Sequence, residues 1–269
     1  MATFKTSVII STFNQPEWLQ KVLWGYELQT ESNFEIIIAD DGSTEENKQL
    51  INDFIEQSSL NIEYIWQKDN GFQKTKILNK AILKTSANYL IFTDGDCIPR
   101  NDFVETHIKL KKNNTFLSGG YFKLPQSISK SISKKNIENQ ECFELNWLYK
   151  NGLKKTFKTN KLTAKGFKSW LLNSFTPTKA TFDGMNVSGW KRAIINVNGF
   201  DERMQYGGED RELGERLMNE GIKFKQIRYS AICLHLDHER GYVNPEMIEN
   251  NMKIRALTKK YKVKRTLFG

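Results

Sequence analysis

The segment Asp94-Gly95-Asp96 places two carboxylates on either side of a glycine. It follows residues 89–93, an apolar, β-branched and aromatic run that predicts a buried strand. Carboxylate oxygens suit Mg²⁺ or Mn²⁺, and such a cation in turn suits a diphosphate. Gly95 has no Cβ, so a bulky ligand can approach the backbone there. Asp and Gly are also common turn residues, and taken alone the segment favours an ordinary acidic turn.

Two further polar clusters follow predicted strands. Thr12-Phe13-Asn14 comes after the apolar run 7–11, and Asp40-Asp41 comes after the run 35–39. Strands of a parallel sheet are nearly continuous apolar runs, and ligands of open α/β sheets bind beyond the carboxyl ends of the strands. Three polar clusters on one such edge therefore predict a nucleotide site.

The elements that must position these clusters alternate between strand and helix. Strands are expected at residues 7–11, 35–39, 61–66, 89–93, 116–122, 184–188, 224–227 and 231–234. Helices are expected at about 16–26, 43–57, 73–84, 101–112 and 190–197, and from about residues 210 and 245. Asn14 and Ser43 are the expected caps of the first two helices. The alternation predicts an α/β fold whose parallel sheet is covered by helices on both faces.

The 269 residues suffice for one large domain, or for one domain with an insertion. A net charge of +9 fits nucleic acid, an anionic membrane surface or phosphorylated substrates, without choosing among them. The three cysteines are widely spaced, which argues against a disulfide framework and a zinc site. With no apolar run of membrane-spanning length and no secretory signal, we expect a cytoplasmic protein. Peripheral attachment to the inner face of the cell membrane stays open.

The composition changes over residues 123–179, which contain twelve lysines and three acidic residues, interleaved with aromatic residues and leucines. This segment is either a solvated, partly helical insertion or a basic aromatic surface for an acceptor or an anionic membrane. A basic helix closes the chain from about Pro245.

The C-terminal half contains two more candidate groups. In Gly207-Gly208-Glu209-Asp210 the glycines let the backbone approach a ligand, and the carboxylates begin a predicted helix. Acidic residues are electrostatically favoured at a helix start, so capping also explains them. His235 and His238 follow the predicted strand 231–234, in a chain with only three histidines, and are candidate metal ligands.

Six segments, in chain order, resemble inverting glycosyltransferases of family 2 with the GT-A fold: SVIISTFN, ADDGST, QKDNGFQ, TDGD, GMNVSGW and GFDERMQYGGEDREL. The likeness is closer to chondroitin-polymerase-type capsule transferases and to galactosyltransferase-like C-terminal modules. It covers about residues 5–122 and 181–240, and residues between them have no matched counterpart. It implies a single GT-A domain with a Rossmann-like, mostly parallel central sheet. The implied parts are a nucleotide-binding half (1–122), the basic insertion (123–180), an acceptor and catalytic half (181–240) and the closing helix (241–269).

The resemblance also implies a role for each matched position. The nucleotide would be bound by residues of the first half: Thr12, Phe13, Asp40, Asp41, Asn70, Gly71, Gln73, Asp94 and Gly95. Asp41 would bond the uracil, and Asp94 would lie near the ribose. Asp96, with Asp94 beside it, would hold Mn²⁺ or Mg²⁺ on the diphosphate.

The C-terminal half would supply the remaining groups. His235 resembles the C-terminal metal ligand of the family, and His238 is the alternative. Glu209 would hold the acceptor, and Asp210 would be the general base.

These roles fit transfer of a hexose or N-acetylhexosamine from a UDP-sugar to a hydroxyl of a glycan or lipid-linked glycan, as in polysaccharide, capsule or lipopolysaccharide assembly. A sugar-phosphate nucleotidyltransferase is one alternative, but the loop at residues 12–15 lacks the Gly-rich basic pattern usual there. A basic nucleic-acid-binding protein is another, without a visible recognition module. We expect no nucleic-acid partner, and the donor sugar, acceptor and oligomeric state stay open.

Overall fold

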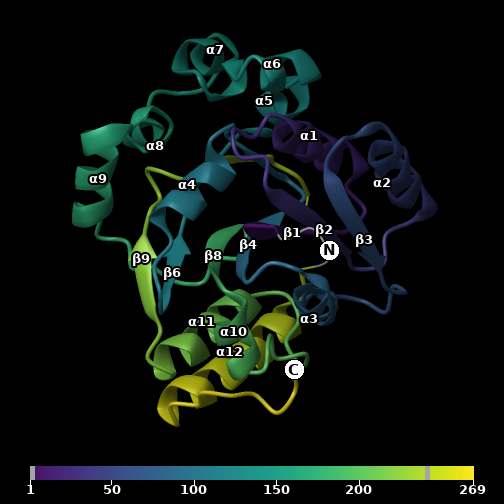
Figure 1. Ribbon diagram of the computed structural model, residues 1–269, viewed down its shortest axis with the longest axis vertical. Helices are drawn as coiled ribbons and strands as arrows, with labels where there is room; N and C mark the ends of the chain where they lie inside the picture. Colours follow the sequence, from purple (N-terminus) through teal and green to yellow (C-terminus); the bar gives the residue numbers. More distant parts are fainter. Residues whose placement is uncertain (1–3, 240–242) are drawn as a thin grey trace.

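The computed structural model describes residues 4–239 and 243–269 (Figure 1). A seven-stranded sheet has the order β3-β2-β1-β4-β8-β6-β9, and a three-stranded sheet has the order β5-β10-β7. The strands are β1 (Thr6–Thr12), β2 (Phe34–Asp40), β3 (Asn61–Trp66), β4 (Tyr89–Asp94), β5 (Cys97–Pro99), β6 (Thr115–Ser118), β7 (Gly120–Lys123), β8 (Asn186–Trp190), β9 (Lys223–Gln226) and β10 (Ile232–His235).

Helices precede, follow and cover these strands. They are α1 (Pro16–Glu27), α2 (Glu45–Gln57), α3 (Lys74–Lys84), α4 (Phe103–Leu110), α5 (Gln126–Ser131), α6 (Lys134–Glu138), α7 (Leu145–Lys150), α8 (Asn160–Thr163), α9 (Gly166–Phe175), α10 (Lys191–Asn196), α11 (Glu209–Asn219) and α12 (Pro245–Lys260). The basic closing helix predicted from Pro245 is confirmed as α12. The predicted boundary between residues 240 and 241 lies outside the described residues.

The central sheet is mostly parallel, as predicted. Strands β1 to β4 run parallel to one another, while β8 lies antiparallel between β4 and β6. The single strand predicted at residues 116–122 is wrong, because the chain changes sheets there. Strand β6 pairs in the central sheet and β7 pairs with β10 in the small one.

Both faces of the central sheet are covered by helices. Side chains alternate across a strand, so Val8 and Ile10 of β1 pack into one core and Ile9 packs into the other. The first core includes α1, α2 and α4, and the second includes α3, α10 and α11. All three side chains are fully buried, which fixes the β1 register and the position of its carboxyl end.

The expected caps at Asn14 and Ser43 are wrong. Helices α1 and α2 begin after Gln15 and Thr44, and neither has a side-chain cap. Instead, the Asn14 N–H donates to Ser43 Oγ and the Thr44 N–H donates to Asn14 Oδ1, each at 2.8 Å. These crossed bonds join the loops after β1 and β2 and hold the two strand ends together.

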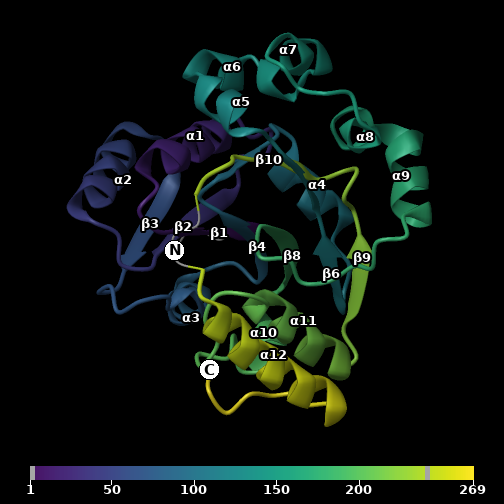
Figure 2. The same ribbon diagram turned by 180° about the vertical axis from the view of Figure 1, so that it is seen from behind.

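The insertion forms an arc of short helices that begins beside α1 and ends beside β9 (Figures 1 and 2). Its first part is not simply solvated, because Ile128, Ile137 and Leu148 are buried in the core that includes α1. Helix α12 packs against α11 at the other end of the molecule. None of the helices in the described part of the chain has the length and apolarity to cross a membrane.

Candidate active site

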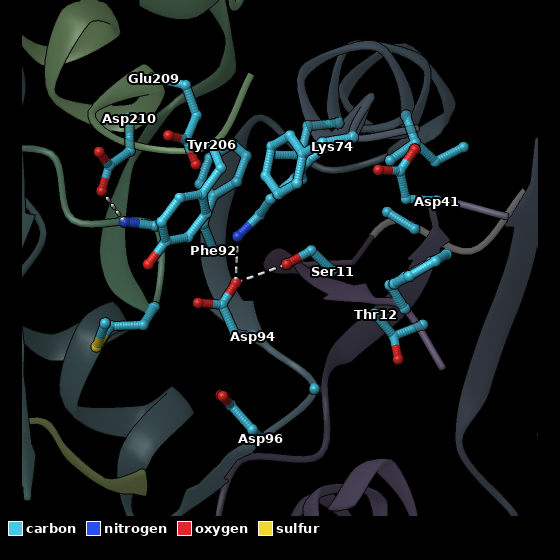
Figure 3. Close-up of a pocket in the computed structure, with 18 of the residues that line it drawn as sticks. Ser11, Thr12, Asp41, Lys74, Phe92, Asp94, Asp96, Tyr206, Glu209 and Asp210 are labelled. Atoms are coloured by element: carbon cyan, nitrogen blue, oxygen red, sulfur yellow. Dashed lines mark hydrogen bonds and ion pairs between the residues drawn. The ribbon is translucent and has the colours of Figure 1, made fainter. Parts of the chain in front are cut away.

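A cleft of about 460 Å³ opens beyond the carboxyl ends of β1 and β4 and is bounded on its far side by the start of α11. Figure 3 shows Asp41 at one end, Asp94 in the middle, and Glu209 and Asp210 at the other end. We call these the Asp41 end and the Asp210 end. Asp96 lies below Asp94 in the same view. The tertiary fold therefore gathers acidic residues from both halves of the chain into one cavity.

The carboxylate at the Asp41 end is fixed by two hydrogen bonds. Gln67 Nε2 donates to Asp41 Oδ1 at 2.6 Å, and the backbone N–H of Gln73 donates to Asp41 Oδ2 at 2.8 Å. Burial raises the pKa of Asp41 to about 6, although these two bonds lower it. Gln67 was not predicted as a site residue, and its position directly after β3 was the available signal.

The structure sorts the residues predicted for the nucleotide into two groups. The cleft is lined by Thr12, Phe13, Asp41, Gly71, Asp94 and Gly95, and not by Asp40, Asn70 or Gln73. Asn70 is exposed, and Gln73 acts through its backbone N–H on Asp41.

Asp40 is fully buried and does not reach the cleft. Its Oδ1 accepts from the backbone N–H of Ser43 at 2.8 Å, and its Oδ2 accepts from Asn47 Nδ2 at 3.0 Å and Tyr64 OH at 2.9 Å. Because both oxygens are engaged by the protein, Asp40 holds the loop that presents Asp41.

The centre of the cleft contains an ion pair that the sequence did not predict. Lys74 Nζ donates to Asp94 Oδ1 at 2.7 Å, and Ser11 Oγ donates to the same oxygen at 2.6 Å (Figure 3). Burial lowers the pKa of Lys74, but the carboxylates of Asp94, Glu209 and Asp210 more than compensate and raise it above its ordinary value. Lys74 is therefore a fixed positive charge between the two ends.

A carboxylate and two imidazoles form a compact group near the middle of the cleft. His238 Nε2 lies 2.9 Å and His235 Nε2 lies 3.5 Å from Asp96 Oδ2, and the three potential ligand atoms fall within 4.8 Å of one another. Strand β10 pairs with β5 so that His235 is opposite Cys97, which brings it beside Asp96. His235 was the predicted ligand and His238 the alternative, and the structure brings both to one oxygen. Asp94 is not among the residues of this group, and its Oδ1 accepts from Lys74 and Ser11.

This group fits a divalent cation. Burial raises the pKa of Asp96, but the hydrogen bond from His238 and the charges of both histidines outweigh it and hold the pKa at about 2. The buried Nδ1 of His235 has no hydrogen-bond partner among the described residues. An ionised carboxylate and two imidazoles with little exposure are a suitable ligand set for a metal ion.

At the Asp210 end, two carboxylates occupy the first turn of α11. Gly207 and Gly208 precede them with φ of 108° and 93°, a region that favours glycine. The Gly207 N–H donates to Glu209 Oε2 at 3.0 Å, and the Gly184 N–H donates to Asp210 Oδ2 at 3.1 Å. The glycines thus let the chain turn sharply enough for both acids to reach the cleft.

The acids of the Asp210 end hold protons more tightly than usual. Burial, followed by the charge of Asp210, raises the pKa of Glu209 to about 7, and burial also raises the pKa of Asp210. Asp183, a cleft residue that the sequence did not predict, has its pKa raised to about 6 by burial and then by Asp210. Its position directly before the segment GMNVSGW was the available signal. Three acids thus share a poorly solvated space, with Lys74 as a neighbouring positive charge.

Comparisons with known proteins agree with this geometry. Residues 7–171 match the family described as Glycosyl transferase family 2, and residues 174–239 match one described as the N-terminal domain of galactosyltransferase. The first match extends to residue 171 and so spans most of the insertion.

Two curated relatives are polysaccharide synthases. The Escherichia coli chondroitin synthase is 27% identical over 250 residues, covering 85% of this chain and 34% of the relative. The Pasteurella multocida hyaluronan synthase is 29% identical over 238 residues, covering 82% of this chain and 23% of the relative. The chain therefore spans about a third or less of the length of these relatives.

Solved structures share the fold. Staphylococcus aureus TarS 1–349, in complex with UDP-GlcNAc, has a TM-score of 0.63 at 16% identity and covers 96% of this chain and 69% of its own. The mannosyltransferase PcManGT from Pyrobaculum calidifontis, in complex with GDP-Man and Mn²⁺, has a TM-score of 0.60 at 14% identity. The match covers 96% of this chain and 72% of PcManGT. The predicted α/β fold is confirmed, and the chain is a glycosyltransferase with the GT-A fold that belongs to glycosyl transferase family 2.

Proposed function

We propose that this cleft transfers a hexose or N-acetylhexosamine from a UDP-sugar to a hydroxyl of a glycan or glycolipid acceptor, with inversion at the anomeric carbon and with a divalent cation. The observation that carries the proposal is the order of groups along one cavity. Asp41 lies at one end, Asp94 and Asp96 in the middle, and Asp210 at the other end. A nucleotide, its diphosphate and an acceptor hydroxyl need such groups in this order.

The Asp41 end suits the nucleoside. A fixed carboxylate can accept the uracil N–H, and the bonds from Gln67 and Gln73 keep its oxygens in place. Thr12 lies at the same end (Figure 3), and it and Phe13 line the cavity and would contact the base and ribose. TarS, which shares the fold, was solved with UDP-GlcNAc, and this supports a uridine donor here.

Asp96, His235 and His238 would hold the cation. Mg²⁺ strongly prefers oxygen ligands, so a set with two imidazoles favours Mn²⁺ over Mg²⁺. When bound, the cation would offset the negative charge that develops on the departing diphosphate. Lys74 would place a second positive charge beside Asp94, in the middle of the cleft.

Asp210 would accept the proton of the attacking hydroxyl, and Glu209 would hold the acceptor. The backbone N–H groups of Gly184 and Arg211 both donate to Asp210, which favours its ionised form against the effect of burial. One displacement inverts the anomeric centre, so an α-linked donor would give a β-linked product and needs no second nucleophile. The named relatives support a polysaccharide as the acceptor class.

A donor screen tests the proposal directly. The purified chain is incubated with individual UDP-sugars and glycan acceptors, with Mn²⁺, with Mg²⁺ or with a chelator, and released UDP is measured. We expect acceptor-dependent UDP release that is highest with Mn²⁺ and abolished by chelator, and a β-linked product by NMR from an α-linked donor. Pyrophosphate turnover without UDP release would favour a nucleotidyltransferase. Transfer that is unchanged by chelator would remove the cation from the proposal.

A further inference from the structure

Helix α9 exposes its apolar side chains and turns polar ones toward the protein. Phe167, Trp170 and Phe175 are 74%, 57% and 77% exposed, whereas Ser169 is buried. A helix on the surface of a globular protein normally shows the opposite arrangement, with its apolar stripe against the core. The usual burial of aromatic residues therefore does not explain this helix.

Hydrogen bonds specify the inverted orientation. The Tyr229 N–H donates to Asn173 Oδ1 at 2.9 Å, and Asn173 Nδ2 donates to Ser230 Oγ at 2.9 Å. Ser230 Oγ also bonds Ser169 Oγ at 3.3 Å. The polar face of α9 is thus attached to the turn between β9 and β10, and its aromatic face is directed to solvent.

The exposed rings form one cluster. Phe167 and Trp170 are stacked with centroids 5.4 Å apart, and Leu171 is 39% exposed on the next position of the helix. Residues 167, 170, 171 and 175 follow helical spacing and so lie on one face. Helix α9 lies at the edge of the molecule beside β9 (Figures 1 and 2), and the exposed side chains form an apolar surface on it.

The chain segment that contains this cluster carries only positive charge. Residues 145–182 contain eight lysines and no aspartate or glutamate. Lys165 and Lys168 are exposed at the start of α9, and Lys158 and Lys179 are exposed on either side of it in sequence. A second copy of this chain would bring the same positive charges together, so the charge disfavours self-association through α9.

We propose that α9 docks the protein onto an anionic lipid surface, with its aromatic side chains in the headgroup region and its lysines paired with anionic headgroups. Amphipathic aromatic rings are favoured at the boundary between water and acyl chains, and basic side chains are attracted to anionic leaflets. A glycan that stacks on aromatic rings would be better served by a groove, whereas these rings are more than half exposed. This inference does not depend on the proposed transfer reaction.

The second basic helix, α12, supplies a matched control. It packs against α11, away from α9 (Figure 1). Several of its positive charges are already paired with acids of the protein, including Arg255 and Lys259 with Glu215. Lys260 at its end and Lys262 just after it are exposed and outside the cleft, so K260E/K262E changes the net charge as much as K165E/K168E does.

The test is co-sedimentation of the purified chain with phosphatidylcholine vesicles, with and without phosphatidylglycerol, at low and high salt. Wild type should bind the anionic vesicles at low salt and lose binding as salt rises. Each basic residue near an anionic surface strengthens partitioning roughly fivefold, so K165E/K168E should weaken it by roughly 25-fold or more. F167S/W170S/F175S should also weaken binding by roughly tenfold or more, and K260E/K262E should keep most of it.

Several results would overturn the proposal. These are no binding of wild type to anionic vesicles at low salt, an equal loss in K260E/K262E, and binding to an anionic polysaccharide without binding to vesicles. A dimer in size-exclusion chromatography that F167S/W170S/F175S dissociates would instead assign the face to a second copy. Thermal melts confirm folding of each variant. W170F retains a ring, and quenching by brominated lipids should fall in this variant if Trp170 enters the headgroup region.

Discussion

Asp96 and the pair Glu209–Asp210 lie in one cleft and differ in their neighbouring side chains. Asp96 is buried, yet the adjacent His238 and His235 hold its pKa at about 2. Glu209 is also buried, and there the charge of Asp210 adds to the effect of burial and raises the pKa to about 7. Both groups are poorly solvated, and the difference lies in whether the nearest ionisable groups are imidazoles or other carboxylates.

This difference separates two chemical roles. A carboxylate that stays ionised over the whole physiological range suits a permanent ligand for a cation, whereas carboxylates that bind protons near neutrality suit proton exchange. Burial alone would have raised the pKa in both groups. We therefore propose that the neighbouring side chains set the role of each acid, and four predictions test this assignment.

The largest expected effect comes from Asp210→Asn. Asparagine keeps the size and much of the hydrogen bonding but cannot accept a proton, so transfer should fall by roughly 10²- to 10⁴-fold. UDP affinity should survive, because Asp41 and Asp96 lie elsewhere in the cleft. Turnover and calorimetric UDP affinity are measured on the same preparation, with Asp53→Asn on α2 as the control. Near-normal turnover would remove Asp210 from the base role, and lost UDP affinity would assign it to the donor site or the fold.

Asp96→Ala should weaken metal-dependent UDP binding by roughly tenfold or more. Loss of a residue that only hydrogen-bonds to a metal ligand already lowers metal affinity by about tenfold or more. Calorimetric titration of UDP with and without Mn²⁺ measures it, and wild type with chelator should resemble the variant. His235→Ala and His238→Ala show which imidazole takes part, because only a ligand should reduce the Mn²⁺ dependence. Equal metal-dependent binding in Asp96→Ala and wild type would end the metal assignment.

Glu209→Gln should stabilise the protein above neutral pH. The folded chain holds the Glu209 proton up to a pKa of about 7, whereas an ordinary glutamate releases it near 4.5, so wild type loses stability as pH rises between these values. Glutamine avoids this loss, and we expect a gain of about 1–3 kcal/mol at pH 8 that shrinks toward pH 4.5. Urea unfolding at both pH values measures it. In activity assays the same variant should raise the acceptor KM. If the difference in unfolding free energy between the variant and wild type were the same at both pH values, the raised pKa would be contradicted.

The smallest expected effect concerns the fall of kcat/KM toward low pH. Protonation of Asp210 should abolish its basicity, so kcat/KM should fall as pH decreases through its raised pKa. Lys74 lowers the pKa of both Glu209 and Asp210, so Lys74→Met should move this fall in rate to higher pH. Rates measured across pH 5–8 decide it. If kcat/KM fell at the same pH in Lys74→Met and wild type, Lys74 would not act on these acids.

Much of the fold followed from local pattern in the sequence. Apolar runs predicted β1, β2 and β4, and Gly207 and Gly208 marked the turn before α11, because side-chain periodicity and glycine φ values are properties of neighbouring residues. The order of short polar clusters likewise indicated the family. Each of these features depends only on residues within about one helix or strand, so the sequence alone was enough to identify them.

Tertiary structure decided which acids belong together and which way side chains point. Asp40 and Asp41 are adjacent, yet one is enclosed by Tyr64 and Asn47 while the other lines the cleft. Strand alternation says that neighbours point to opposite sides, but it does not say which side is open.

Long-range contacts determined the rest. His238 bonds Asp96 across 142 positions of sequence, and the turn at Tyr229 holds Asn173 so that the aromatic face of α9 turns outward. A helical pattern by itself would have placed those rings inside. Periodicity is local, whereas the environment of a charge or a ring is set by whatever the rest of the chain packs against it, and only the folded chain contains that information.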